Sequence, residues 1–130
     1  MAGVNMGGSN PIRRILVADG TRTISETMMQ ALSESGFSTK CAHSGEQAIE
    51  LARTFEPDLF ISALIMHDIT GIEAAREIHD FLPSCRVILI SGRETALEPG
   101  PHTQRGDADF EILAGSPVPE VLLDRIASLK

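Results

Sequence analysis

Apolar residues in this chain fall into two alternating kinds of segment: short continuous runs, and longer stretches with helical spacing. The runs are IRRILVAD from Ile12, FSTKCA from Phe37, DLFISALI from Asp58, RVILIS from Arg86 and FEIL from Phe110. Short apolar runs bounded by Gly, Pro or polar residues are typical of strands buried on both faces. The pattern therefore predicts five strands.

The stretches between these runs repeat their apolar residues every three or four positions, which is typical of amphipathic helices. The shared faces are Ile24, Met28, Ala31 and Leu32, then Ala48, Leu51, Ala52 and Phe55, then Ile72, Ala75, Ile78 and Leu82. A last helix is predicted over residues 119–130, where Pro119 suits the first turn.

Three residue pairs have the spacing of a capping box, in which a hydroxyl and a Glu or Gln three positions later bond each other's backbone. They are Thr23 with Glu26, Ser44 with Gln47, and Thr70 with Glu73. Each pair predicts the start of a helix.

Strands and helices alternate along the chain, and the strands are continuously apolar. This combination indicates parallel strands covered by helices on both faces, which is an α/β fold with a doubly wound parallel sheet. The segment at residues 91–108 occupies the place of a fourth helix, but Pro99, Gly100 and Pro101 lie in its middle. Proline costs about 3 kcal/mol in a helix interior. We therefore predict that this fourth helix is short or disrupted.

The 130 residues are enough for one domain with its own core, because 42% of them are apolar. Residues 1–11, rich in Gly, Asn and Ser, are predicted to be a flexible N-terminal lead, and residues 12–130 the domain. No apolar run approaches the roughly 20 residues that span a bilayer, and the first residues lack the basic and apolar parts of a secretion signal. We expect a cytoplasmic protein without a membrane partner.

Charge and composition exclude several classes of ligand. The net charge is −7 and there is no basic block, so we expect no nucleic-acid partner. There is no Trp or Tyr to stack on bases or sugars. Cys41 and Cys85 are expected to be buried free thiols. Cys41 with His43 supplies two ligand types where zinc sites use three or four, so no metal site is predicted.

The five strand–helix units carry, in order, ILVAD, PDLFISALI, TGIEAA, VILISG and FEIL. In this order they resemble the receiver domain of two-component response regulators, over residues 12–129. The resemblance implies a flavodoxin-like sheet with strand order 2-1-3-4-5. Functional groups then gather at the carboxyl ends of the strands, where such sheets bind ligands. The positions concerned are Asp19, Gly20, Ala63, Ser91 and Gly115.

In a working receiver, an acidic pair after the first strand and an aspartate after the third hold a magnesium ion, and the aspartate takes the phosphoryl group. The matching residues here are Asp19, Gly20 and Ala63, while Gly115 stands at the lysine position and Ser91 at the hydroxyl position. A methyl group cannot attack phosphorus, and one carboxylate makes a poor magnesium site. The resemblance therefore implies a degenerate phosphoacceptor pocket with no catalytic residue, no metal and no cofactor.

The leading hypothesis is a pseudo-receiver in two-component, phosphorelay-type signalling. It lacks the phosphoacceptor Asp, is not an enzyme, and acts as a phosphorylation-independent protein-interaction module. Its partner would be a histidine kinase or an output protein, and a homodimer is left open.

Two alternatives remain. The first is a divergent receiver phosphorylated at Asp68 or at a hydroxyl such as Ser62 or Ser91. Asp58 is excluded, because five residues at about 3.3 Å each place it roughly 16 Å from Ala63. The second alternative is a flavodoxin-like domain that binds a small anion or nucleotide through the loop DGTRT, near a helix start.

Overall fold

The computed structural model describes residues 12–91, 110–114 and 119–128. The strands are β2 (Arg14–Ala18), β3 (Ser38–Ala42), β4 (Leu59–Ala63), β5 (Arg86–Ser91) and β6 (Phe110–Ala114), and the helices are α1 (Arg22–Glu34), α2 (Gly45–Phe55), α3 (Gly71–Phe81) and α5 (Pro119–Ser128). The predicted alternation of strands and helices is confirmed. The N-terminal lead, most of the predicted fourth helix and Gly115 lie outside the described residues.

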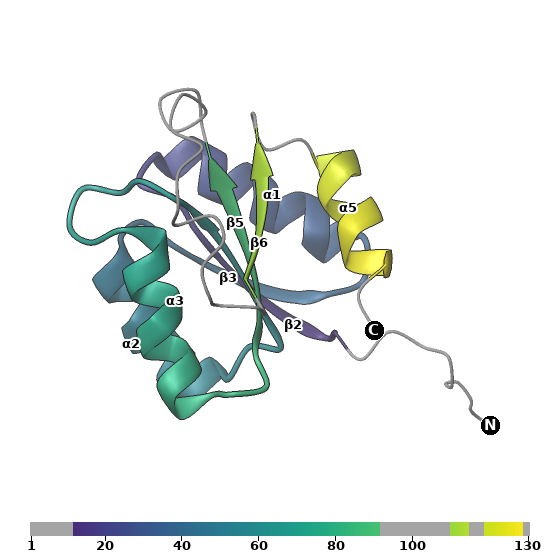
Figure 1. Cartoon of the computed structure of the whole chain (residues 1–130). Helices are drawn as coiled ribbons and strands as arrows, with labels where there is room; N and C mark the ends of the chain where they lie inside the picture. The colour runs from purple at the N-terminus through teal and green to yellow at the C-terminus, as the bar shows by residue number, and fades with distance from the viewer. Residues whose placement is uncertain (1–11, 92–109, 115–118, 129–130) are drawn as a thin grey trace.

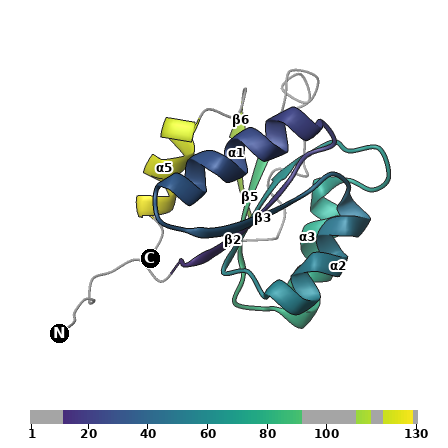
Figure 2. The same cartoon turned by 180° about the vertical axis from the view of Figure 1, so that it is seen from behind.

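The strands form one parallel sheet in the order β3-β2-β4-β5-β6, which is 2-1-3-4-5 along the chain. The predicted order is confirmed. Helices α2 and α3 cover one face of this sheet and α1 and α5 the other (Figure 1), as the view from behind also shows (Figure 2). None of the helices in the described ranges is long and apolar enough to cross a bilayer.

Alternate residues of each central strand pack into two separate cores, one on each face of the sheet. In β2, Ile15 and Val17 pack with residues of α1 and α5, whereas Leu16 and Ala18 pack with residues of α2 and α3. Side chains of successive strand residues point to opposite faces, so a strand covered on both sides must be apolar throughout. This is why the strands appear in the sequence as unbroken apolar runs.

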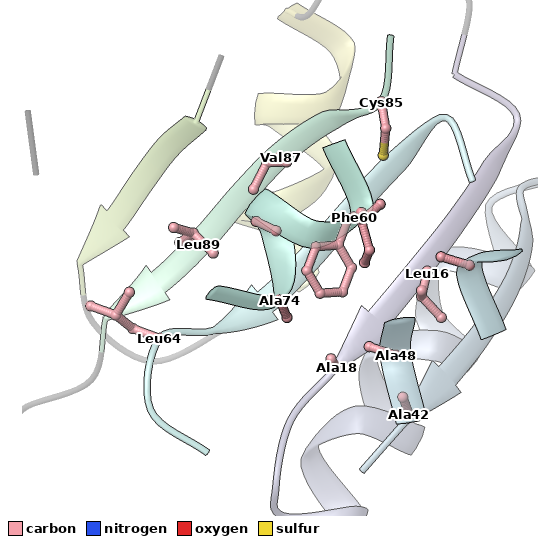
Figure 3. Close-up of a cluster of buried hydrophobic side chains, with 13 residues drawn as sticks. Leu16, Ala18, Ala42, Ala48, Phe60, Leu64, Ala74, Cys85, Val87 and Leu89 are labelled. Carbon is pink, nitrogen blue, oxygen red and sulfur yellow. The ribbon is translucent and has the colours of Figure 1, made fainter. Parts of the chain in front are cut away.

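Phe60 of β4 is at the centre of the core under α2 and α3 (Figure 3). The side chain is completely buried, and its neighbours on the adjacent strands are Leu16 and Val87. The helices present mainly alanines to this core, namely Ala48, Ala52, Ala74 and Ala75. Small side chains let a helix lie close to the sheet, and the phenylalanine fills the space that remains.

Two of the three predicted helix starts are confirmed. Ser44 Oγ accepts a hydrogen bond from the Gln47 amide at 3.1 Å, and Thr70 and Glu73 form a complete capping box. The start predicted from Thr23 is wrong. Helix α1 begins at Arg22, and the side chain of its N-cap residue Thr21 makes no capping bond. Asp19 accepts from the Thr21 amide at 2.9 Å, and this tight turn starts the helix two residues earlier than predicted.

Replacement of Phe60 by alanine is expected to lower the free energy of unfolding by about 3–5 kcal/mol, because it leaves a cavity that rigid strands cannot close. Urea unfolding followed by circular dichroism measures the change. The control is Val121→Ala on α5, where the side chain is 48% exposed. It should change stability by less than about 0.5 kcal/mol. Equal losses in the two variants would contradict the assigned core.

Candidate functional site

Strand register brings four of the five predicted site residues to the same edge of the sheet. Ala18 pairs with Ser62, so Asp19 and Ala63 follow at the same level on neighbouring strands. Ala63 pairs with Ile90, and Ser91 ends β5 one residue further on. Gly20 follows Asp19 directly, and the fifth position, Gly115, lies outside the described residues. This edge is the candidate site.

Asp19 is half-buried, and its carboxylate takes part in the loop after β2. Its Oδ1 accepts from the Thr21 amide at 2.9 Å, and its own amide donates to the Ala42 carbonyl at 3.1 Å. Burial raises the pKa of Asp19 above its usual range, and the bond from Thr21 partly offsets this. The carboxylate therefore has a local structural role in shaping the turn into α1.

The two serines at this edge are buried. Ser62 is fully buried, and its hydroxyl donates to the Ala63 carbonyl at 2.8 Å. Ser91 is 6% exposed. Between them along the edge, Ala63 presents only a methyl group, on a half-buried residue. The hydroxyls therefore face the protein interior more than the solvent.

The imidazole of His67 lies over Gly20. A Cβ atom at Gly20 would be 3.0 Å from His67 Cε1 and 3.2 Å from His67 Nε2, closer than atoms normally pack. His67 belongs to the loop between β4 and α3. His67 is exposed to solvent, and its ring also occupies the space into which a side chain at position 20 would project.

Asp68 attaches the same loop to the start of α2. Its carboxylate accepts from the Gly45 amide at 3.0 Å and from the Glu46 amide at 2.9 Å. Burial acts to raise the pKa of Asp68, but hydrogen bonds from Glu46, Gly45, Ile69 and its own amide prevail and lower it to about 2. An anion at a helix N-terminus also interacts favourably with the helix dipole. Asp68 is thus a cap supplied by a distant part of the chain.

Gly45 permits this close approach. A Cβ atom there would lie 2.4 Å from Cγ1 of Ile69, the residue that follows Asp68. Neither the bonds of Asp68 nor the position of His67 follows from local spacing. Two features of the sequence could have indicated this contact: Gly45 lies in the first turn of a helix, and Asp68 is an aspartate that does not cap a helix next to it in sequence.

A second polar cluster joins α1 to the end of β3. Ser25 is fully buried, its hydroxyl donates to the Arg22 carbonyl at 3.1 Å, and it lies 3.0 Å from His43 Nδ1. Both cysteines are free, as predicted, but only Cys85 is buried, and the predicted burial of Cys41 is wrong because this thiol is half-buried. Burial, with a smaller contribution from Glu26, raises the pKa of the Cys41 thiol. Within the described ranges, no three His, Cys, Asp or Glu side chains come together as metal ligands would.

The candidate site does not fit a magnesium ion. Magnesium takes oxygen ligands in near-octahedral order, several of them from carboxylates. Among the residues that end the described strands at this edge, Asp19 alone has a carboxylate, and one of its oxygens already accepts from Thr21. Gly20 has no side chain and is covered by His67, and Ala63 offers a methyl group.

A family model described as the response regulator receiver domain matches residues 15–110. Curated relatives include the response regulator MprA of Mycobacterium avium (strain 104) and that of Mycobacterium tuberculosis (strain H37Rv). Each is 26% identical over 97 residues, which make up 75% of this chain and 42% of the relative. The chain thus spans less than half the length of the curated relatives it matches.

Solved structures of the same shape include the chemotaxis protein CheY4 of Vibrio cholerae, with a TM-score of 0.76 and 22% identity over 88% of this chain and 96% of that one. The response regulator TrrA of Thermotoga maritima, solved in complex with Mg²⁺-BeF, has a TM-score of 0.73 and 26% identity over 88% and 96% of the two chains. These similarities agree with the strand order and the placement of the helices.

Replacement of Asp68 by asparagine is expected to lower the free energy of unfolding by about 1 kcal/mol at neutral pH, because a charged cap of α2 is lost. The pKa of Asp68 is lower in the folded state than its ordinary 3.8, so the carboxylate stabilises the fold above that pH. The difference between the variant and the natural chain should shrink as pH falls from 3.8 towards 2. Urea unfolding across this pH range measures it.

The control for this experiment is Asp80→Asn on the exposed surface of α3. It removes the same charge near a helix C-terminus, where an anion is not favourable, and should not lower stability. A pH-independent loss in Asp68→Asn would show that the charge of Asp68 is not what caps α2.

Replacement of Asp19 by asparagine is expected to raise the stability of the fold at neutral pH, the opposite of the effect of Asp68→Asn. Because the pKa of Asp19 is raised in the folded state, folding disfavours its charge, and stability falls as pH rises through that pKa. Asparagine is neutral and keeps an oxygen for the Thr21 amide, so the variant should melt at a higher temperature at pH 7. Well below pH 3.8, the melting temperatures of the variant and the natural chain should converge. Calorimetry on both chains tests whether the melting temperature rises, and Asp124→Asn is the charge-matched control.

Proposed function

Because this chain belongs to the family of response regulator receiver domains, we propose that it acts in two-component signalling as a pseudo-receiver. Receiver domains are signalling modules, and this one would work through protein contacts without accepting a phosphoryl group. The observation that carries the proposal is the methyl group of Ala63 at the carboxyl end of β4, beside Asp19. Transfer of a phosphoryl group to protein needs an attacking oxygen at that place.

The neighbouring hydroxyls do not replace the missing carboxylate. Ser62 is fully buried, and its hydroxyl hydrogen is already donated to the Ala63 carbonyl. Ser91 is 6% exposed. A serine also needs an adjacent base to become a nucleophile. Among the residues that end the described strands here, Asp19 is the candidate base, and one of its two oxygens already accepts from the Thr21 amide.

The aspartates that lie just before β4 and in the loop after it both have structural roles. One Asp68 oxygen binds the Gly45 amide and the other binds the Glu46 amide, so a phosphoryl group on either oxygen would break a cap of α2. Asp58 lies at the opposite end of β4, where its carboxylate accepts from the Arg13 and Arg14 amides at 2.9 and 2.8 Å. These bonds argue against either residue as a substitute acceptor.

The loop after β2 is also poorly suited to bind an anion. The Thr21 amide donates to Asp19, and the Arg22 guanidinium lies 3.4 Å from Glu26. A bound phosphate would have to compete with both carboxylates for these donors. The negative charge of Asp19 at the mouth of the loop would repel it further.

Without phosphorylation, the module must be controlled by its abundance or by binding a partner. A ligand shifts a conformational equilibrium only through different affinities for the two states. We propose a histidine kinase or an output protein of a two-component pathway as the partner. A homodimer is the second arrangement that a binding study should examine, by light scattering on the isolated chain.

Incubation with Mg²⁺ and acetyl phosphate is expected to leave the intact mass of the protein unchanged. The reason is the absence of a reactive oxygen beside Asp19. Mass spectrometry at neutral pH under conditions that preserve acyl phosphates measures it. A receiver domain that has the third-strand aspartate, treated in parallel, should gain one phosphoryl group.

A stoichiometric phosphoryl adduct on this chain would contradict the proposal. Asp68→Asn and Ser62→Ala would then locate the acceptor, since the adduct should disappear from the variant that lacks it. Circular dichroism on both variants ensures that a lost adduct does not reflect a lost fold.

A further inference from the structure

We propose that His67 is a specificity-determining residue that closes the candidate site to divalent cations by filling the space above Gly20. The inference rests on the proposed function and gives it a physical cause beyond the absence of a carboxylate at position 63. It predicts that carboxylates returned to the strand ends will not bind a cation well until the imidazole is removed.

A side chain at position 20 would be directed at His67. From Gly20, a Cβ atom would point at the imidazole, with Cε1 at 3.0 Å, Nε2 at 3.2 Å and Nδ1 at 3.6 Å. An aspartate carboxylate extends one carbon–carbon bond beyond Cβ, followed by its two oxygens. At position 20 it would need the volume that the ring now fills. Glycine and histidine are therefore complementary in shape at this point.

Hydrogen bonds hold the loop on both sides of His67. On one side, the Gly71 amide donates to the Leu64 carbonyl at 2.8 Å and closes the base of the loop. On the other, Asp68 is bonded to the Gly45 and Glu46 amides. The backbone of His67 cannot move far from Gly20 without breaking these bonds. Because the His67 side chain is exposed, its rotation into solvent is the remaining way to open the site.

The imidazole ring of His67 is not a ligand that magnesium prefers. Imidazole offers nitrogen, whereas magnesium selects carboxylate, carbonyl and water oxygens. His67 is therefore not a substitute ligand for magnesium. For metals that accept nitrogen, His67 and Asp19 make two ligands, fewer than the three or four of a protein zinc site.

The test compares two variants of the full chain. Gly20→Asp with Ala63→Asp restores the strand-end carboxylates implied by the family resemblance, and the triple variant adds His67→Ala. Titration with Mg²⁺, followed by calorimetry, should give a Kd for the triple variant at least roughly tenfold lower than for the double, the scale on which groups around a metal alter its affinity. The matched control adds Ile65→Ala to the double variant, in the same loop and at a side chain 53% exposed. It should bind like the double variant.

Equal Mg²⁺ affinity in the double and triple variants, measurable or not, would overturn the proposal. An equal gain from Ile65→Ala would overturn it too, because loosening of the loop would then suffice. These outcomes are independent of the mass experiment on the natural chain. A phosphoryl adduct on the natural chain would contradict the proposed function, whereas the Mg²⁺ affinities of the variants test the role of His67.

A measurement on the natural chain does not depend on how the variants fold. Proton NMR should show a nuclear Overhauser effect between His67 Hε1 and the Gly20 α-protons, since the ring contacts that glycine. Gly20→Ala should shift the His67 ring resonances, because a methyl group forces the ring to move by a few tenths of an ångström. Absence of the Overhauser effect would overturn the proposed position of the imidazole.

Discussion

Burial of the sheet on both faces is the constraint on which the rest of this structure depends. Each central strand supplies one core with its odd residues and the other with its even residues, as Leu16 and Val17 do in β2. A slip of one residue would exchange the two sets, and a polar neighbour would enter a core. The register is therefore strongly specified. Because the register is specified, the ends of the strands, including Asp19 and Ala63, are aligned without any ligand to hold them.

At the aligned edge, the carboxylates of the described residues bind backbone amides. Asp19 shapes the turn into α1, and Asp68 caps α2 from another loop. Burial raises the pKa of Asp19, whereas amide bonds lower that of Asp68. The strand ends of this edge have the arrangement of a receiver domain, but their charges differ in effect: the charge of Asp68 stabilises the fold, whereas folding disfavours the charge of Asp19.

Most of the fold was predictable from sequence because its signals are local. Continuous apolar runs indicated buried parallel strands, and capping pairs such as Thr70 with Glu73 located two helix starts. The predicted start of α1 was wrong, because the hydrogen bond from the Thr21 amide to Asp19 outweighed the capping-box spacing of Thr23 and Glu26. For the site, the order of the strands was enough to bring Asp19 and Ala63 to one edge. The contact of His67 with Gly20 was not predictable, since it depends on how a loop folds back over a distant turn.

The cap that Asp68 provides also makes α2 an indicator of what its neighbouring loop is doing. The first amides of a helix have no partner within the helix and normally exchange their hydrogens with water quickly. Here the Gly45 and Glu46 amides are bonded to a carboxylate from another segment. Their exchange is therefore slow only while the loop stays attached. Deuterium uptake at these two positions reads out the opening of a segment that has no regular hydrogen-bond ladder of its own.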